Sequence, residues 1–370
     1  MSVLDLSSAA LPQAPDAGAP RSELIAVDWG TSNLRAWRLD AQGAILDQRR
    51  SDQGLLHVPT AGGPEAFAQV LRAVVGPWLG PHSQVLMAGM VGSRQGWVEA
   101  PYVATPAGTA ELAAALVAVP FDVPCRLVPG VATRALGAPS ASAMSAPEAA
   151  AGTGAPDVMR GEETQLAGLP EGAEDTGLAV LPGTHSKWVW REHGRIVWFR
   201  TFMTGELFDL LVHHSILGRS MLGDTFDEAA FDQGLAAARQ GGGLLEKFFA
   251  VRSRWLFGEL SAQAQRSCLS GLLIGTECAD GLAAVAREAG PHAAALMATV
   301  ASAGSAPAQL VASPVLAGLY RRALQAHGLA ATVVDESATA RGLWRIARQA
   351  GALPGMSGLP ATLAAAPPQA

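Results

Sequence analysis

The sequence predicts an α/β fold in which one type of domain occurs twice. The chain has 370 residues, which is enough for two domains of roughly 150 residues each. Short apolar runs that fit buried strands alternate with longer segments that fit helices. Two of these strands, one in each half, run into a turn rich in glycine and hydroxyl side chains and then into another strand. The repeat indicates an internal duplication with its boundary just before Leu178.

The first hairpin begins with the apolar run Leu24–Val27, followed by DWGTSNLRAWR from Asp28 onward. Gly30 permits a ligand to approach the backbone closely. Turn amides, together with the hydroxyls of Thr31 and Ser32, can bind an anion. The acid at the strand end can hold a metal ion or a metal-bound water. These groups suit a metal–nucleotide phosphate, and a hairpin turn without a ligand is the alternative.

The other elements of the first half follow from apolar periodicity. The pattern predicts a strand at 44–47, a helix at 64–78, a strand at 85–88, a helix at 111–119 and a strand at 125–128. A turn at 51–54 is expected to face the same cleft as the first hairpin. The loop at 89–97 combines several glycines with Ser, Arg, Gln and Trp, which makes it a candidate binding loop. An irregular connection is the alternative.

Low-complexity segments set the predicted domain limits. Residues 1–22 are rich in Ala, Pro, Ser and Gly and are predicted to be a disordered tail. Residues 353–370 are predicted to be a frayed tail, and 135–156 a flexible surface insertion. The first domain then covers 23–176 and the second covers 177–352.

An acidic segment precedes the second hairpin. Asp157–Gln165 leads into a helix whose first turn carries Glu162 and Glu163. The helix dipole favours carboxylates at this position. That preference alone explains the pair, so the local pattern does not require a catalytic role.

The second hairpin has the same sequence pattern as the first, with a cation in place of the acid. The apolar strand Leu178–Leu181 ends in PGTHSK, and Trp188 begins the next strand. Lysine occurs only at Lys187 and Lys247, whereas arginine is common. A retained lysine can mark a place that needs a compact point charge, and chance retention is the alternative.

The second half continues with elements of both kinds. The pattern predicts strands within 194–204, a helix at 207–217, helices within 226–260 interrupted by glycines at 241–243, a helix at 269–287, a strand at 309–312, a helix at 315–326, a strand at 332–334 and a last helix through 346. The glycines of the 269–287 helix are expected to permit close helix packing.

Composition excludes several classes of protein. The net charge is −6 and no basic block occurs, which argues against nucleic acid and anionic membrane as partners. None of Cys125, Cys268 and Cys278 belongs to a C-x-x-C pair, so a disulfide scaffold, zinc ribbon or iron–sulfur cluster is not expected. No signal peptide and no apolar run long enough to span a bilayer are expected. These features fit a cytoplasmic protein.

Seven motifs, in this order, resemble those of the 2-dehydro-3-deoxygalactonokinase family of the actin/hexokinase/Hsp70 ATPase superfamily. They lie between Leu24 and Ala347 and read DWGTSNLRAW, MAGMVGSRQGW, APY, VMRGEETQ, LPGTHSKW, FRTFMTGEL and LSGLLIGTE. The resemblance implies two RNase H-like domains with the nucleotide in the cleft between them. It also implies ATP- and Mg²⁺-dependent phosphorylation of the 6-hydroxyl of 2-dehydro-3-deoxy-D-galactonate, in galactonate catabolism.

The resemblance assigns the nucleotide site to the two hairpins. Asp28 is expected to bind Mg²⁺, and Lys187 to neutralise phosphate charge. The residues expected to hold the γ- and β-phosphates are Gly30, Thr31, Ser32, Gly183 and Thr184. The adenosine loop of this superfamily usually carries adjacent glycines or Gly-Ser, whereas this chain has Ala312 and Ser313. Alanine adopts positive φ only with strain, so the adenine contacts depart from the usual pattern.

The resemblance also assigns the substrate site. Glu162 is expected to be the general base, with Glu163 as the alternate. Arg160 is expected to bind the substrate carboxylate with its planar fork, and an ion pair with a neighbouring glutamate is the alternative. Arg35 is expected to reach phosphate or sugar acid. The other residues expected in the sugar pocket are Asn33, Gly92, Ser93 and Trp97.

Other functions fit the sequence less well. A kinase for another sugar acid, such as 2-dehydro-3-deoxy-D-gluconate, is the nearest alternative, because no residue pattern fixes one stereocentre. An ATPase activator of radical dehydratases needs interface cysteines that the spacings do not supply. A sugar-sensing repressor needs a DNA-binding module, and the segment before Leu24 is too short and too rich in Ala and Pro for one. A purely structural scaffold protein also fits less well, because it would not need the charged residues of both hairpins. The sequence does not decide whether the protein forms a homodimer.

Overall fold

The structure is a computed structural model. It describes residues 23–59, 62–133, 156–170, 175–291, 293, 295 and 308–351. Both predicted tails, and the insertion predicted at 135–156 except for its last residue, lie outside this part of the chain.

The first sheet is mixed and has the strand order β3-β2-β1-β4-β7-β6. Its strands are β1 (Glu23–Trp29), β2 (Leu34–Leu39), β3 (Ile45–Ser51), β4 (Ser83–Ala88), β6 (Val117–Val119) and β7 (Cys125–Leu127). Strands β1, β2 and β3 form an antiparallel meander, whereas β4 pairs with β1 in parallel. The β1–β2 hairpin predicted from sequence is therefore present, and it lies at the centre of the sheet.

Alternate residues of β1 pack on opposite faces of this sheet. Ile25 and Val27 lie in a core with α1 (Gly63–Val75), while Leu24 and Ala26 lie in a second core with α10 (Ala338–Gln349). Side chains alternate across a strand, so a strand that packs on both faces carries an uninterrupted apolar run, here Leu24–Val27.

The second sheet repeats the arrangement, with the order β12-β11-β10-β13-β14. Its strands are β10 (Gly177–Leu181), β11 (Ser186–Glu192), β12 (Arg195–Phe202), β13 (Ala308–Val311) and β14 (Ala331–Val334). Strands β10, β11 and β12 form an antiparallel meander, and β13 pairs with β10 in parallel. Two sheets of this kind confirm the predicted α/β fold with two RNase H-like domains.

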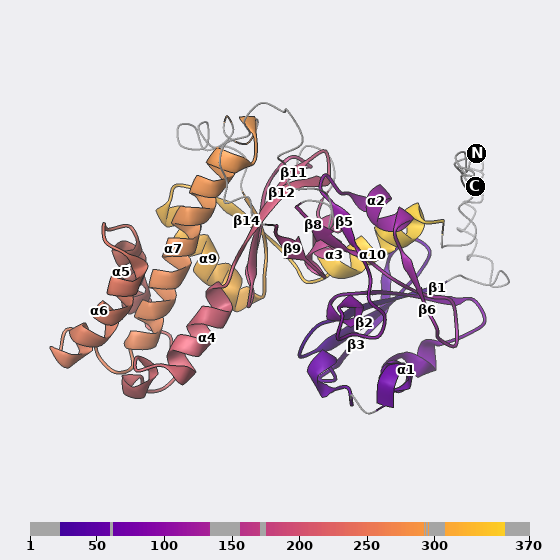
Figure 1. The fold of residues 1–370 in the computed structure, drawn as a ribbon, viewed down its shortest axis with the longest axis horizontal. Helices are drawn as coiled ribbons and strands as arrows, with labels where there is room; N and C mark the ends of the chain where they lie inside the picture. Colours follow the sequence, from indigo (N-terminus) through magenta and orange to yellow (C-terminus); the bar gives the residue numbers. More distant parts are fainter. Residues whose placement is uncertain are drawn as a thin grey trace, which may run out of the picture.

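The helices of the second half are α4 (Thr204–His214), α5 (Glu228–Ala238), α6 (Leu244–Leu256), α7 (Gln265–Glu288) and α9 (Pro314–Ala326). Figure 1 shows them gathered on one side of the second sheet. A Cβ at Gly271 of α7 would lie 2.0 Å from the carbonyl oxygen of Phe231 in α5, and one at Gly234 would lie 2.1 Å from that of Cys268. The predicted close packing through glycine is therefore confirmed.

Two sequence-based expectations need correction. The helix predicted at 111–119 is shorter, α2 (Thr109–Ala114), because the valine-rich end pairs with β7 as strand β6. Helix α7 is long and apolar enough to cross a membrane, contrary to expectation. However, 67% of its most apolar segment is buried inside the protein, as in the core helix of a globular domain.

A small third sheet leads into the acidic helix. It has the order β5-β8-β9, with β5 (Tyr102–Ala104), β8 (Gly130–Ala132) and β9 (Val158–Met159). Helix α3 (Glu162–Ala167) follows β9 and packs closely on α10, since a Cβ at Gly342 would lie 1.8 Å from the carbonyl oxygen of Thr164. Although α10 falls within the predicted second domain, it covers the first sheet (Figure 1). The exact division at residue 177 stays a prediction.

Candidate active site

The first hairpin presents its turn to solvent. The backbone N–H of Gly30 donates to the carbonyl oxygen of Asn33 at 2.9 Å, which closes a four-residue turn. Thr31, Ser32 and Asn33 are exposed. A Cβ at Gly54 would lie 2.2 Å from the backbone of Ser32, so the following loop packs directly against the turn. The predicted phosphate-binding groups are thus accessible and held by a second loop.

Asp28 lies at the end of β1 beside this turn, and its carboxylate is 14% exposed. Arg35 of β2 lies 2.6 Å from Asp28 Oδ2, and it also lies 3.2 Å from a carboxylate oxygen of Glu336. Glu336 also pairs with Arg50 at 2.9 Å. The segment before α10 therefore holds the arginine that orients Asp28. Sequence reasoning missed Glu336 because its position next to the hairpin depends on the return of the chain to the first sheet.

The second hairpin packs against the start of α4. The backbone N–H of Glu206 donates to the carbonyl oxygen of Thr184 at 3.0 Å. A Cβ at Gly205 would lie 2.4 Å from the carbonyl oxygen of Gly183, so only glycine permits this approach. His185 Nε2 also lies 2.5 Å from Glu206. The N-terminal end of an 11-residue helix, which favours anions, is therefore adjacent to the turn.

The two adjacent acids of α3 occupy different environments. Glu163 is fully buried, and its carboxylate accepts the backbone N–H of Gly161 at 2.7 and 2.9 Å. Burial, followed by the charge of Glu162, raises the pKa of Glu163 to about 8. Gly161 itself has a φ of 108°, which favours glycine. Glu163 therefore belongs to the interior, whereas its neighbour Glu162 is partly exposed.

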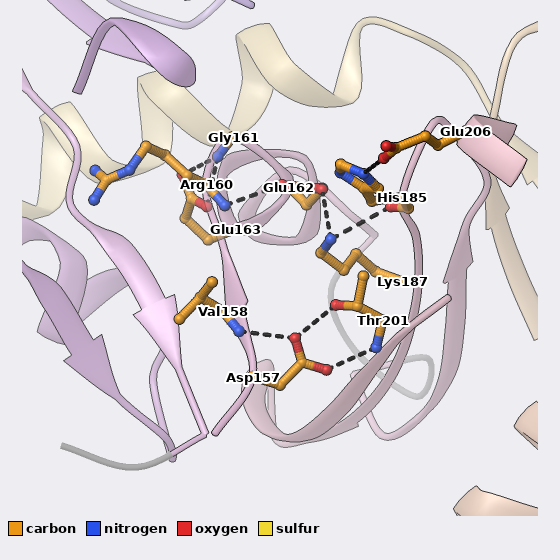
Figure 2. Close-up of polar contacts among 10 residues, drawn as sticks. All are labelled: Asp157, Val158, Arg160, Gly161, Glu162, Glu163, His185, Lys187, Thr201 and Glu206. Carbon is orange, nitrogen blue, oxygen red and sulfur yellow. Dashed lines mark hydrogen bonds and ion pairs between the residues drawn. The ribbon is translucent and has the colours of Figure 1, made fainter. Parts of the chain in front are cut away.

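Glu162 links the two halves of the site. Its side chain is 24% exposed, and Oε1 lies 3.4 Å from Lys187 Nζ at the start of β11. Oε2 accepts the backbone N–H of Arg160 at 3.1 Å. Figure 2 shows the Glu162 side chain directed at Lys187, and the Arg160 side chain leaving in the opposite direction. Strand β11 and helix α3 thus bring a carboxylate and an ammonium group together across the predicted domain boundary.

Arg160 extends into the first domain and contacts the segment that contains Ala100 and Tyr102. Its Nη2 donates to the carbonyl oxygen of Ala100 at 2.8 Å, and its guanidinium lies 4.4 Å from the ring centre of Tyr102. A Cβ at Gly92 would lie 3.0 Å from Nη1. Arg160 Nε and Nη1, and the hydroxyl of Ser93, are buried without a hydrogen-bond partner in the part of the chain that the structure describes. Buried polar groups are almost always satisfied, so these donors can each accommodate a further acceptor.

Trp97, which was expected in the sugar pocket, instead belongs to an aromatic cluster of the core. It is 7% exposed, and its ring centre lies within 6.4 Å of those of Trp29, Phe67 and Phe121. The ring fills the core between the first sheet and α1, because it buries more apolar area in this aromatic cluster than it would in a sugar pocket. Sequence reasoning missed Tyr102 as the aromatic partner of Arg160, although the short motif APY contains it.

A cavity of about 260 Å³ lies beside the second hairpin. Helices α4, α7 and α9 contribute to its walls, which include Gly183, Thr204, Phe208, Arg266, Leu319 and Tyr320. Its size is near the lower end of ligand pockets, about 300 Å³. Ala312 instead lines a second, open cavity of about 800 Å³ with Asp335 and Glu336, and Ser313 precedes α9. Sequence reasoning missed the cavity-lining residues of α4 and α7, because only the folded chain brings these helices together.

Comparisons with known proteins agree with this architecture. The sequence profile of the 2-keto-3-deoxy-galactonokinase family matches residues 28–346. A probable 2-dehydro-3-deoxygalactonokinase of Rhizobium meliloti (strain 1021) is 38% identical over 334 residues, which cover 86% of this chain and 97% of that protein. The 2-dehydro-3-deoxygalactonokinase of Escherichia coli (strain K12) is 34% identical over 310 residues, covering 84% and 92% of the two chains.

A solved structure supports the same relationship. The crystal structure of a candidate 2-dehydro-3-deoxygalactonokinase from Sinorhizobium meliloti superposes with a TM-score of 0.68 at 35% sequence identity. The match covers 88% of this chain and 98% of that chain. On the profile match and the two relatives, this chain belongs to the 2-keto-3-deoxy-galactonokinase family.

Proposed function

We propose that this chain transfers the γ-phosphoryl group of ATP to the 6-hydroxyl of 2-dehydro-3-deoxy-D-galactonate. The observation that carries this proposal, beyond family membership, is the position of Glu162. It extends from the start of α3 to within 3.4 Å of Lys187 at the second hairpin. A base beside a phosphate-binding turn is the arrangement that phosphoryl transfer to an alcohol requires.

The nucleotide is proposed to lie with its phosphates between the hairpins. The exposed turn at 30–33 supplies amides and hydroxyls for the γ-phosphate. The turn at 183–184, with the N-terminal end of α4, supplies donors for the β-phosphate. The cavity walled by α4, α7 and α9 would then hold the nucleoside. Ala312 and Ser313 would contribute at the edge of this arrangement rather than at its centre.

The residues near the first hairpin are suited to Mg²⁺. Among the described residues, no three His, Cys, Asp or Glu side chains gather into a metal-binding group. Mg²⁺ in kinases commonly needs only one or two carboxylates, because substrate phosphates and waters complete its shell. Asp28 fits this requirement. Arg35 donates a hydrogen bond to its Oδ2, whereas its Oδ1 lies near Gly89 and can bind the ion. Bound there, the ion would neutralise phosphate charge.

The reaction itself needs alignment, charge neutralisation and a proton acceptor. Glu162 takes the proton of the 6-hydroxyl as the oxygen–phosphorus bond forms and the bond to ADP breaks. Lys187 holds the Glu162 carboxylate in place before the nucleotide arrives and then stabilises phosphate charge. Glu163 is not the base in this account, because its carboxylate is enclosed by its own backbone turn.

The opposite end of the sugar acid is proposed to bind at Arg160. A six-carbon acid has its carboxylate and its 6-hydroxyl at opposite ends, and the side chains of Arg160 and Glu162 point in opposite directions (Figure 2). The unpartnered Arg160 nitrogens and the hydroxyl of Ser93 are the donors for the carboxylate. Asn33 and Gly92 complete the proposed sugar pocket, whereas Arg35 remains with the metal-side carboxylates.

An assay of ADP release tests the proposal. The parent protein with ATP and Mg²⁺ should turn over 2-dehydro-3-deoxy-D-galactonate faster than its gluconate epimer. Glu162→Gln should lose roughly 10²–10⁴-fold in kcat, the usual contribution of general base catalysis. A higher rate on the epimer would select the alternative substrate. Retained activity in the variant would remove Glu162 from the mechanism. Cytoplasmic location and the absence of nucleic-acid and membrane partners stay predictions.

A further inference from the structure

A buried carboxylate on α7 connects the elements around the second hairpin. Glu277 is only 3% exposed. It accepts hydrogen bonds from the indole N–H of Trp188 at 2.8 Å and from the hydroxyl of Tyr320 at 2.6 Å. The hydroxyls of Thr204 and Ser186 are further donors that lower the pKa of Glu277, and Ser186 Oγ lies 3.0 Å from the Tyr320 hydroxyl.

The three hydroxyl partners of Glu277 lie at the proposed nucleotide site. Ser186 is the first residue of β11, immediately before Lys187 and two residues after Thr184. Thr204 begins α4, whose N-terminal end packs on the hairpin. Tyr320 of α9 and Thr204 both line the cavity beside Gly183. One carboxylate therefore ties a hairpin strand, two cavity helices and its own helix to a common point.

The chemistry of the group indicates what it contributes. Burial raises the pKa of Glu277, and its hydrogen bonds act in the opposite direction. A buried carboxylate is costly unless donors surround it, and here donors come from three elements. An apolar side chain would fill the space without fixing these hydroxyls. A fully satisfied buried network fixes the relative position of the parts it joins.

We infer that Glu277 is a positioning residue for ATP, which acts through Ser186, Thr204 and Tyr320 to fix the second hairpin against the cavity. This inference rests on the proposed function, in which that hairpin and cavity hold the nucleotide. Glu277 is not among the residues that line the cavity, so its effect on ATP has to pass through its partners. The network should therefore affect nucleotide affinity more than sugar-acid affinity.

Two variants test the inference. Glu277→Gln keeps the shape of the side chain but replaces one acceptor oxygen with a donor. Tyr320→Phe keeps the ring in the cavity wall and removes only the hydroxyl. Loss of a hydrogen bond to a charged group supports an expected weakening of ATP binding by about tenfold or more in each variant. Calorimetric titration of each folded protein with Mg²⁺–ATP, without sugar acid, measures it.

Ser220→Ala is the matched control. The Ser220 hydroxyl donates to the buried side chain of Gln265 at 2.8 Å, also on α7 but outside the network. This variant should lose stability as Tyr320→Phe does, yet bind ATP as the parent does. In steady-state assays, the KM for ATP should rise in the network variants while the KM for the sugar acid stays within about twofold, well below the tenfold change that 1.4 kcal/mol represents.

The outcomes separate the inference from the proposed function. Equal ATP affinity in the parent and both network variants would overturn the inference, as would an equal loss in Ser220→Ala. A parent that binds ATP but does not phosphorylate the sugar acid would overturn only the substrate assignment, and the binding comparison would still decide the role of Glu277. A folded parent that does not bind ATP would overturn both.

Discussion

The buried acid Glu163 should make the stability of this protein fall as pH rises. Its pKa is about 8 in the folded chain, against an ordinary value of 4.5, with burial as the largest cause. Below pH 4.5 both states hold the proton. Between pH 4.5 and 8 the folded state keeps a proton that the unfolded state has released. Stability therefore declines with pH in this window, by about 1.4 kcal/mol per pH unit.

The variant Glu163→Gln isolates this effect. The amide keeps an acceptor for the Gly161 N–H and does not titrate, so the decline due to this carboxyl disappears. From pH 5.5 to 7.5, the parent should lose roughly 2–3 kcal/mol of unfolding free energy relative to the variant. All other titrating groups are common to both proteins. Urea unfolding at several pH values in this range, with equal m-values required, gives the difference.

Activity separates the two neighbouring acids. Glu163→Gln should lower kcat less than tenfold, that is by less than about 1.4 kcal/mol of activation free energy. Glu162→Gln is the matched control: it should lose activity but keep the part of the pH-dependent decline that is due to burial, the largest cause of the raised Glu163 pKa. Parallel stability curves for the parent and Glu163→Gln would refute the assignment of a buried, protonated carboxyl at this position. A large loss of kcat in Glu163→Gln, with the fold intact, would refute its exclusion from catalysis.

Three further substitutions probe other parts of the site. Asp28→Asn should raise the Mg²⁺ concentration needed for half-maximal rate and lower kcat by roughly 10²-fold, and unchanged Mg²⁺ dependence in a titration would contradict its metal role. Arg160→Lys should raise the KM for the sugar acid by roughly tenfold, since a point charge replaces the planar fork, with the KM for ATP unchanged as the internal control. Trp97→Phe should cost about 1–3 kcal/mol of stability through loss of buried volume while both KM values stay constant, and a selective rise in the sugar-acid KM would return Trp97 to the pocket.

The parts of the fold that were predictable are those with a local signal. The apolar run of β1, the turn at Gly30 and the matching hairpin at Gly183 follow from spacing and turn chemistry, and the structure has all of them. The glycines of α7 likewise indicated close packing. By contrast, the sequence predicts the end of a helix where β6 lies, because a three-residue strand such as Val117–Val119 is defined by its partner β7 rather than by its own periodicity.

The candidate site was predictable only where its residues belong to the hairpins or to the acidic helix. Sequence placed Glu162 and Glu163 together, but only burial distinguishes them. Glu336 gave no signal, and the motif LSGLLIGTE contains Glu277 without indicating its role, because each contacts a hairpin that is far from it in the sequence. Trp97 carried a misleading signal, since an aromatic residue in a glycine-rich loop fits both a sugar pocket and a core.

The central claim is phosphoryl transfer to the 6-hydroxyl, and the position of the phosphate in the product tests it most directly. After reaction with ATP, Mg²⁺ and 2-dehydro-3-deoxy-D-galactonate, the proton-coupled ³¹P spectrum of the product is recorded. A phosphate ester on C6 couples to the methylene protons of that carbon, so the account predicts a triplet that is lacking with Glu162→Gln under the same conditions. A doublet from an ester on a secondary carbon, or inorganic phosphate alone, would contradict the account.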